Sequence, residues 1–361
     1  MERERITLIA TSNINYDQRL QKIASSLAKR GAEVLLLGRA KGAAEVESPK
    51  NYRAKNLTCF FEKGVFFYME INLRFFFFLL ANKTDKLCAN DTDTLLAAYL
   101  ASFFRNFTFY FDAHEYFSEV PELEGKKLKK RMWNFIERLA MKRVDQAYTV
   151  NQSLAEIFIA KYHKDFQVLR NTPVLEELHL EAHREAYILY QGALNKGRGL
   201  EVLIETMQQI DRPLYLAGKG DLEQELKFLV KKLNLEHKVK FLGNLHPEEL
   251  KEVSKKAYLG INILEASSLN YYYSLANKFF DYMHAGVPQI SMAFPEYQRI
   301  VSQFKVALLI DSLDVESLYN AIQEVEKDKS LYQEIQAQCR EAAQVYNWTK
   351  EEEVLYSIYF N

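Results

Sequence analysis

Short apolar runs alternate with longer amphipathic segments along the first half of the chain. The runs have the length and the β-branched or aromatic content of buried strands and lie at 6–11, 32–38, 86–90 and 107–114. Segment 17–31 between the first two runs carries its apolar residues on one face and ends at Gly31, where a helix C-cap is expected. A second helix is expected through 95–104. Strands that alternate with helices predict a parallel sheet covered by helices on both faces.

The same rhythm restarts in the second half after a composition break at 168–174, where Pro173 prevents a helix from continuing. Strands are predicted at 185–192, 212–218, 238–244, 259–264 and 288–292, and helices at 199–209, 221–233, 247–256 and 275–285. The last stretch, 330–361, is predicted to be helical.

These patterns predict an α/β protein of two Rossmann-like domains, which a chain of 361 residues is long enough to form. We expect an N-terminal domain over 1–170 and a C-terminal domain over 171–345, with a helix at about 346–361 crossing back to the first domain. The carboxyl edges of two parallel sheets are expected to face a ligand cleft between the domains.

Residues 57–80 form the most apolar stretch of the chain. Charged residues at 62, 63, 70 and 74 interrupt it, so we expect a soluble protein with no membrane span, which takes about 20 apolar residues. The four phenylalanines at 75–78 are expected to form a buried helix face rather than a lipid anchor.

The three cysteines, at 59, 88 and 339, are widely separated and form no CxxC pair. This pattern fits a reducing compartment and argues against a disulfide framework or a zinc–thiolate site. We therefore expect a cytoplasmic protein.

The net charge of −1 conceals an asymmetry between the two halves. Residues 1–170 contain 27 Lys and Arg against 20 Asp and Glu, a net charge of +7, and the remainder has a net charge of −8. A basic half suggests an anionic partner, but the sequence contains none of the usual base-reading modules, so no nucleic acid is expected.

The segment 125–143 concentrates this positive charge, with eight Lys or Arg among apolar and aromatic residues. Two interpretations stay open from the pattern alone. The segment is either an anionic-membrane surface element, which would place the protein peripherally on the inner face of a membrane, or an ordinary helix with one apolar face in the core.

Five segments occur in an order and spacing that resemble one known family. They are FDAHEYFSEVPEL (111–123), YQGALNKGRGLEVLIETM (190–207), LAGKGDLEQEL (216–226), KVKFLGNLHPEEL (238–250) and SLNYYYSLANKFFDYMHAGVPQI (268–290). Together with Asp17-Gln18-Arg19 ahead of the first helix, they are similar to glycosyltransferase family 4. The resemblance covers nearly the whole chain and implies the GT-B fold and sugar transfer with retention of the anomeric configuration.

The resemblance implies a donor site for a nucleotide-diphosphate sugar in the second domain. Asp281 takes the place of the family's ribose-binding carboxylate, and Arg198 and Lys278 meet the diphosphate. Backbone N–H groups at an expected helix start are further phosphate ligands, since a helix N-terminus attracts anions. The remaining donor-side positions are Tyr273, Ser274 and Leu275 at that helix start, Gly218, and Asn244 and Leu245 near the base.

Two positions depart from the family pattern. Tyr273 stands where a glutamate is usual, and Ala193 where an arginine is usual, so Arg198 bears more of the diphosphate charge. The base is expected to be uracil or guanine, and no cofactor or metal is expected.

In the first domain, the resemblance implies a catalytic role for His114, which is expected to reach the donor sugar, beside Arg198. Asp17, Arg19 and Glu115 are expected on the acceptor side.

Two motifs imitate metal sites. Asp91-Thr92-Asp93 has the form of a metal-binding DxD but stands before a helix, where an aspartate is expected to cap free N–H groups. His179 and His183 have the spacing of two zinc ligands, but the sequence shows no third ligand.

The sequence thus predicts a retaining, metal-independent glycosyltransferase acting on a glycan, a lipid-linked acceptor or a cell-envelope polysaccharide precursor. Two alternatives stay open: a non-catalytic partner subunit that binds a nucleotide sugar, and a sugar-nucleotide epimerase of the same fold.

Overall fold

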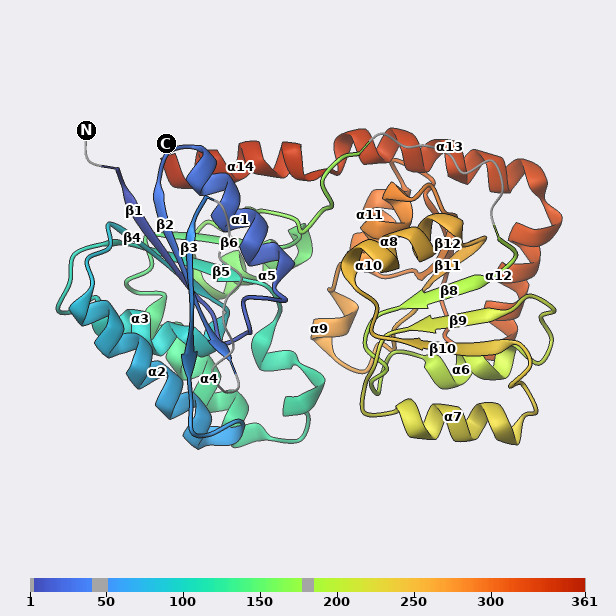
Figure 1. Ribbon diagram of the computed structural model, residues 1–361, viewed down its shortest axis with the longest axis horizontal. Helices are drawn as coiled ribbons and strands as arrows, with labels where there is room; N and C mark the ends of the chain where they lie inside the picture. Colours follow the sequence, from blue (N-terminus) through green and yellow to red (C-terminus); the bar gives the residue numbers. More distant parts are fainter. Residues whose placement is uncertain (1–2, 41–50, 177–184, 361) are drawn as a thin grey trace. The chain divides into compact units, whose positions relative to one another are not determined.

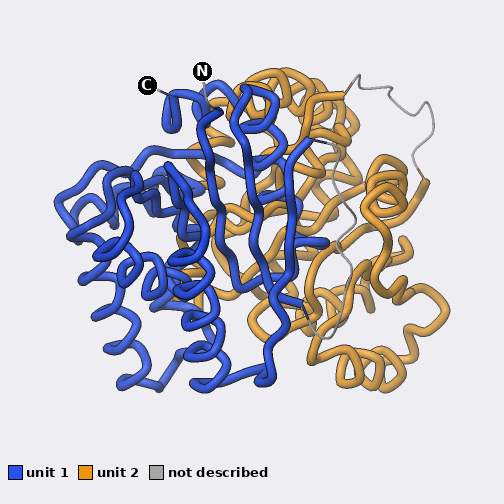
Figure 2. Tube along the Cα trace, turned by 60° about the vertical axis from the view of Figure 1, so that its left-hand side comes forward, with its two compact units in different colours: residues 1–171, 352–361 blue, residues 172–351 orange. Residues whose placement is uncertain are grey.

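The computed structural model describes residues 3–40, 51–176 and 185–360, and the chain forms two compact units. Unit 1 comprises Met1–Asn171 and Glu352–Asn361, and unit 2 comprises Thr172–Glu351 (Figure 2). Each unit is a Rossmann-like α/β domain with a parallel sheet, so the predicted fold class is confirmed. The two histidines at 179 and 183 lie outside the described residues.

Unit 1 contains a seven-stranded sheet in the order β3-β2-β1-β4-β5-β6-β7 (Figure 1). Its strands are β1 (Arg5–Ile9), β2 (Glu33–Ala40), β3 (Arg53–Thr58), β4 (Lys86–Asn90), β5 (Thr108–Ala113), β6 (Gln146–Thr149) and β7 (Gln167–Val168). The central strands are buried apolar runs. The chain order reverses between β1 and β4, and ligands of such sheets bind at the carboxyl ends beside this switch point.

Helices cover both faces of this sheet. They are α1 (Gln18–Lys29), α2 (Gly64–Ala81), α3 (Leu95–Ala101), α4 (Lys127–Ala140), α5 (Gln152–Tyr162) and α14 (Trp348–Phe360). The C-terminal helix α14 lies beside α1, where Tyr356 donates a hydrogen bond to Ser26 O, and the Tyr359 ring stacks 4.3 Å from the Tyr110 ring. Helices α2, α3 and α4 lie next to one another as a separate layer (Figure 1).

Helix α2 differs from the sequence expectation in two ways. It is the one helix in the described part of the chain that is long and apolar enough to cross a membrane, judged by length and composition alone. The charged residues did not break the apolar run because the helix begins only at Gly64, and within it just Glu70 and Arg74 are charged, paired with each other at 2.7 Å. The phenylalanines at 75–78 do not form one buried face, since Phe75 is buried and Phe77 is exposed.

Unit 2 contains a six-stranded parallel sheet in the order β10-β9-β8-β11-β12-β13. Its strands are β8 (Ile188–Gln191), β9 (Leu214–Ala217), β10 (Val239–Gly243), β11 (Leu259–Asn262), β12 (Gln289–Met292) and β13 (Ala307–Ile310). Its helices are α6 (Leu200–Thr206), α7 (Glu223–Lys232), α8 (Pro247–Lys256), α9 (Leu269–Tyr272), α10 (Asn277–His284), α11 (Pro295–Val301), α12 (Val315–Lys327) and α13 (Lys329–Val345). Its switch point lies between β8 and β11.

The predicted helix over 330–361 is two helices, α13 and α14. The helix ends at Tyr346, whose backbone leaves the helical region, and the N–H of Trp348 donates to the carbonyl of Pro173 at 2.7 Å. The chain passes from unit 2 to unit 1 within the second of these helices, between Glu351 and Glu352.

Candidate functional site

Two glycine loops meet at the carboxyl edge of the unit 2 sheet, beside its switch point. Gly192 follows β8 and Gly218 follows β9, and both have positive φ, at 130° and 149°. A Cβ atom on Gly218 would lie 1.9 Å from the carbonyl oxygen of Gly192, so only glycine fits there. The two loops therefore present bare backbone at the place where nucleotide ligands bind in such sheets.

Two cationic side chains near these loops each have a buried nitrogen with no hydrogen-bond partner among the described residues. Lys278, in the first turn of α10, is only 6% exposed, and its Nζ has no hydrogen-bond partner among the described residues. This Nζ lies 3.7 Å from the centre of the Tyr190 ring and next to Gly192. Arg198 lies over the Tyr271 ring, and its Nε is likewise buried without a hydrogen bond in the described structure.

The charge on Lys278 is disfavoured where it stands. Burial lowers the pKa of Lys278 well below its ordinary value of 10.5, and the positive charge of Arg198 lowers it further, with Asp281 opposing both. A buried cation such as Lys278, with the half-buried Arg198 nearby, is costly unless an anion joins it. The sequence prediction that both face a diphosphate is consistent with this geometry and stays a prediction.

Asp281 is held by a hydrogen-bond chain that the sequence did not reveal. Gln191, the last residue of β8, donates to Asp281 Oδ2 at 2.7 Å, and its own Oε1 accepts from the Ser254 hydroxyl at 2.7 Å. Gln191 is buried, so it fixes the orientation of the carboxylate. The one indication of this hydrogen-bond chain in the sequence was Gln191 itself, a polar residue at the end of an otherwise apolar strand.

Three predicted donor-side positions are not at a helix start. Helix α10 begins at Asn277, and Tyr273 and Ser274 instead terminate α9. Their N–H groups donate to Leu269 O at 3.0 Å and Tyr271 O at 3.2 Å, so they are not available to phosphate oxygens. The expectation that these backbone groups bind phosphate is therefore wrong for Tyr273 and Ser274.

The other positions of that prediction lie in loops. Leu275 lies between α9 and α10, and Asn244 and Leu245 follow β10 at the same sheet edge as Gly218. Their predicted roles toward phosphate and base remain untested.

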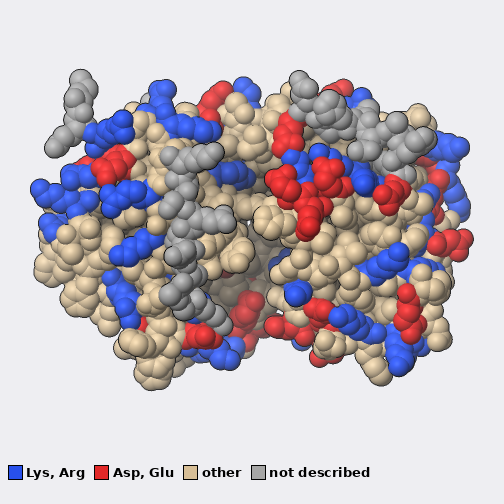
Figure 3. All heavy atoms as spheres, in the orientation of Figure 1, with Lys and Arg blue, Asp and Glu red and all other residues tan. Residues whose placement is uncertain are grey.

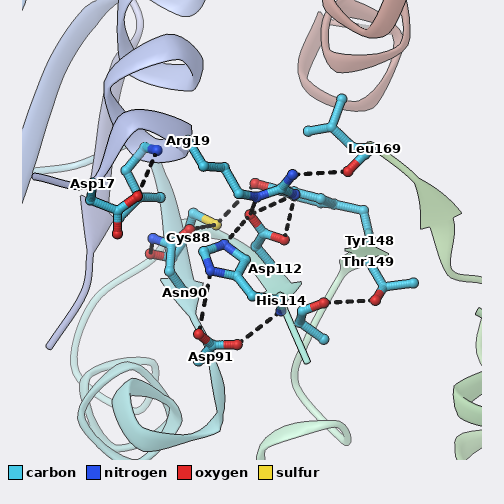
Figure 4. Close-up of polar contacts among 12 residues, drawn as sticks. Asp17, Arg19, Cys88, Asn90, Asp91, Asp112, His114, Tyr148, Thr149 and Leu169 are labelled. Atoms are coloured by element: carbon cyan, nitrogen blue, oxygen red, sulfur yellow. Dashed lines mark hydrogen bonds and ion pairs between the residues drawn. The ribbon is translucent and has the colours of Figure 1, made fainter. Parts of the chain in front are cut away.

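In unit 1, His114 lies directly after β5 at the carboxyl edge of the sheet, between two carboxylates (Figure 4). Its Nε2 lies 2.8 Å from Asp112 Oδ2, and its Nδ1 lies 3.3 Å from Asp91 Oδ2. Burial by itself lowers the pKa of His114, but the charges of Asp112 and Asp91 outweigh it and hold the pKa well above 6.5. The raised pKa favours the imidazolium form, in which both ring nitrogens carry protons and donate to the two carboxylates.

Arg19 completes this cluster from the opposite side of Asp112. The two side chains are 5% and 0% exposed, and the Arg19 guanidinium donates three hydrogen bonds to the Asp112 carboxylate. Its third nitrogen donates to Leu169 O at 3.0 Å. The expectation that Arg19 faces the acceptor is wrong, because its guanidinium is buried and fully engaged.

The Asp91-Thr92-Asp93 motif is neither a helix cap nor a pair of neighbouring free carboxylates. Asp91 makes no side-chain bond to the following helical turn. Its Oδ1 accepts from the His114 backbone N–H at 2.8 Å, and its φ of 62° is a strained conformation for a residue with a side chain. Asp93 is buried and accepts from the Thr11 hydroxyl at 2.5 Å. The capping prediction for this pair is therefore wrong.

Asp17 and Glu115 are the two remaining residues predicted on the acceptor side, and their roles toward an acceptor stay predictions. Asp17 is the N-cap of α1, accepting from Leu20 N at 3.1 Å and from the Ser12 hydroxyl at 2.7 Å. Glu115 is partly buried next to His114. Within residues 3–40, 51–176 and 185–360, no group of three or more His, Cys, Asp or Glu side chains could hold a metal ion.

Comparisons with known proteins agree on the fold. Residues 174–345 match the family described as glycosyl transferases group 1. The chain superposes on sucrose-phosphate synthase from Thermosynechococcus elongatus with a TM-score of 0.83, at 18% identity over 99% of this chain and 98% of the other. It superposes on the Anabaena protein HepE, solved with UDP and glucose, with a TM-score of 0.79, at 16% identity over 98% of each chain.

The similarity in sequence to curated proteins is shorter. The chain is 27% identical over 139 residues to the Campylobacter jejuni enzyme GalNAc-alpha-(1->4)-GalNAc-alpha-(1->3)-diNAcBac-PP-undecaprenol alpha-1,4-N-acetyl-D-galactosaminyltransferase, which covers 36% of this chain and 37% of that enzyme. A second curated relative is matched over only 20% of its length. The two Rossmann-like units and the structural matches together show that the chain has the GT-B fold, and the family match lies within unit 2.

Proposed function

We propose that the protein transfers a sugar from a nucleotide-diphosphate donor to an acceptor. One observation carries the proposal: Lys278 and Arg198 bring two partly or fully buried cationic groups, each with an unpartnered nitrogen among the described residues, to the glycine loops of unit 2. A diphosphate supplies the missing negative charge and hydrogen-bond acceptors, and the bare backbone at Gly192 and Gly218 leaves room for it.

The Asp281 carboxylate is the proposed ribose ligand. Gln191 fixes one carboxylate oxygen and so holds the carboxylate in one orientation, as a ligand of ribose hydroxyl groups requires. The solved HepE structure with UDP and glucose, which shares the fold, supports a nucleotide donor of this type.

In unit 1, His114 is the proposed catalytic residue. Because both ring nitrogens lie against the carboxylates of Asp112 and Asp91, His114 acts as a fixed positive charge rather than as a proton acceptor. A cation held in this way stabilises the negative charge that develops on the leaving diphosphate. Retention of configuration is part of the proposal, and the anomer of the product, observed by NMR, tests it.

Metal-independent donor binding follows from the same charge arrangement. Arg198 and Lys278 neutralise the diphosphate in place of a divalent ion. Donor binding that disappears with EDTA and returns with Mg²⁺ would contradict this part of the proposal.

The acceptor is proposed to be a glycan or lipid-linked precursor at the cytoplasmic face of an anionic membrane. The Campylobacter relative acts on an undecaprenol-linked saccharide, and segment 125–143 brings positive charge to the surface of unit 1 (Figure 3). The free cysteines of the described structure fit a reducing compartment.

Calorimetry and thermal shift with UDP, GDP and ADP and their sugar conjugates test the donor site. A ligand at about 100 times its dissociation constant raises the free energy of unfolding by roughly 2.7 kcal/mol, which is readily measured. Nucleotide release with and without acceptor then separates the alternatives. A transferase releases nucleotide together with a glycosylated acceptor, a non-catalytic subunit binds without release, and an epimerase changes the sugar without an acceptor.

A further inference from the structure

Exposed apolar side chains gather on the layer formed by α2, α3 and α4 of unit 1. We call this surface the α2–α4 face. Its exposed apolar members are Val65, Phe66, Met69, Leu73, Phe77, Leu100, Phe103, Phe104, Leu128, Met132 and Phe135. The side chains of Phe104 and Leu128 are 68% and 81% exposed, so both are largely in contact with solvent. Contiguous apolar surface of this kind marks an interaction site.

Helix α2 is apolar on both of its faces. The stripe at i, i+4 spacing that enters the core consists of Phe67, Ile71, Phe75 and Leu79. The stripe on the opposite side of the helix is exposed and consists of Phe66, Met69, Leu73 and Phe77. Because the buried stripe anchors α2 to the unit, the helix lies along the surface of unit 1 and presents its second apolar stripe outward.

The turn after α3 and helix α4 extend this face. The Phe104 ring contacts the Phe76 ring at 6.0 Å, and the Arg143 guanidinium lies 4.0 Å from the Phe103 ring. Helix α4 buries Trp133 and exposes Phe135 on its outer side. The interpretation of segment 125–143 as an ordinary helix with all its apolar residues in the core is incomplete, because the outward side of α4 carries both basic and apolar residues; the membrane-surface interpretation stays a prediction.

The border of the face is strongly basic. Exposed Lys and Arg side chains follow α4 and its end: Lys126, Lys127, Lys129, Arg131, Arg138, Lys142 and Arg143. The acidic residues within α2 and α4 are Glu70 and Glu137, and each is paired with a basic side chain. Glu137 is buried and bonded to Thr92 and Lys161, and Glu70 pairs with Arg74. On the left side of Figure 3, Lys and Arg side chains lie among residues that carry no charge.

We propose that the α2–α4 face docks on an anionic lipid bilayer, with the phenylalanines of α2 and of 103–104 entering the headgroup and acyl boundary. A basic border attracts anionic headgroups while the apolar centre leaves water. A second copy of the chain fits less well, because a two-fold contact would place each basic border against its own copy. The inference deepens the membrane contact proposed for 125–143 and does not depend on sugar transfer.

Vesicle co-sedimentation tests the proposal with the full chain and no donor. The variant combines Phe66→Ser, Phe77→Ser and Phe104→Ser, all exposed positions. We expect its partition onto phosphatidylcholine–phosphatidylglycerol vesicles to fall at least about 100-fold, because each phenylalanine loses apolar burial. Phe228→Ser, on α7 of unit 2 and 69% exposed, is the matched control and should bind like the parent. Circular dichroism confirms that both variants are folded.

A depth measurement separates insertion from surface attraction. Phe104→Trp, in a chain whose two native tryptophans are replaced by Phe, should be quenched by lipids brominated on their acyl chains. Quenching should persist after salt has screened the surface charges. Equal vesicle binding by the parent and the triple variant, or quenching that vanishes with salt, overturns the insertion. A parent that dimerises in ultracentrifugation and ignores vesicles, with a monomeric triple variant, assigns the face to a second copy instead. Turnover is not part of either readout, so failure here leaves the proposed sugar transfer standing.

Discussion

Replacing Lys278 by Met should separate ligand binding from stability in unit 2. The Nζ of Lys278 is buried without a hydrogen bond in the described structure, 3.7 Å from the Tyr190 ring centre. A buried polar group left unsatisfied costs about 3 kcal/mol when charged. The cation–π contact of a desolvated ammonium returns about 2 kcal/mol. Methionine has a similar length and removes both terms, so the free energy of unfolding should rise by about 1 kcal/mol in the absence of ligand.

Nucleotide binding should change in the opposite direction. A charge-assisted hydrogen bond to a phosphate oxygen contributes about 1.5–3 kcal/mol, so the dissociation constant for UDP or GDP should rise about 10- to 150-fold. Burial and then Arg198 lower the pKa of Lys278 well below 10.5, and the negative charge of a bound diphosphate should raise that pKa again. Calorimetry in buffers of different ionisation enthalpy measures proton uptake on binding, which should be greater for the parent than for the Met variant.

Lys240→Met is the matched control in the same unit. Lys240 is exposed, and its Nζ also lies over a tyrosine ring, 5.1 Å from the centre of Tyr215. Its replacement should leave nucleotide affinity unchanged and stability within about 0.5 kcal/mol. Urea unfolding and calorimetry on both variants give the comparison. A Lys278→Met protein that loses more than about 2 kcal/mol of stability and keeps its nucleotide affinity would refute the reasoning and make Lys278 a structural residue.

Four further variants test the remaining assignments. Arg19→Met should lower the free energy of unfolding of unit 1 by about 3–5 kcal/mol, since the buried Asp112 carboxylate loses three hydrogen bonds and keeps the contact with His114. Arg53→Met, in an exposed pair, should cost less than about 1 kcal/mol in the same urea titration. Burial and then Asp91 raise the pKa of Asp93 from 3.8 to about 7. Between about pH 4 and pH 7 this carboxyl ionises in the unfolded chain but not in the folded one, so the free energy of unfolding falls as pH rises. Asp93→Asn should therefore be up to about 4 kcal/mol more stable than the parent across that window and no more stable below it, as measured by urea unfolding at each pH. Asp281→Asn should weaken bare UDP or GDP and their sugar conjugates alike, by about 1.5–3 kcal/mol in calorimetry, and equal affinity removes it from the ribose. His114→Ala should lower single-turnover rates on the order of 100-fold while donor affinity stays near that of the parent, and near-normal turnover makes the histidine structural.

The alternation of strands and helices could be predicted because it depends on local apolar periodicity. A strand needs a short apolar run, and a helix needs a longer segment with its apolar residues on one face. Both patterns are visible in the sequence. The contacts of His114 were harder to predict from the sequence, although the strand register accounts for its contact with Asp91. Asn90 pairs with Asp112 across β4 and β5, which brings the next residue, Asp91, to the backbone of His114. The bond from Arg19 to Asp112 crosses from a helix to a strand, and no sequence pattern encodes that approach.

Two errors have a common physical origin. The exposed face of α2 could not be separated from the buried one, because both stripes are apolar and the periodicity has no polar phase to orient it. The start of α10 was placed too early because Ser268 begins the four-residue helix α9, which ends in the stretch assigned to the α10 N-terminus. Short helices and uniformly apolar helices carry too little pattern to be positioned by sequence alone.

The cations of the two units differ in one respect that decides which variants matter for function. In unit 1, the positive groups of Arg19 and His114 face the carboxylates of Asp112 and Asp91, so the folded chain already supplies their counter-charges. In the described part of unit 2, Lys278 has no hydrogen-bonded carboxylate, and burial works against its charge, opposed only in part by Asp281. Removing a paired cation must therefore destabilise the fold, while removing an unpaired one must not. Opposite signs in the unfolding free energies of Arg19→Met and Lys278→Met would establish this difference, and a loss of stability in both would mean that the charge of Lys278 is satisfied within the chain.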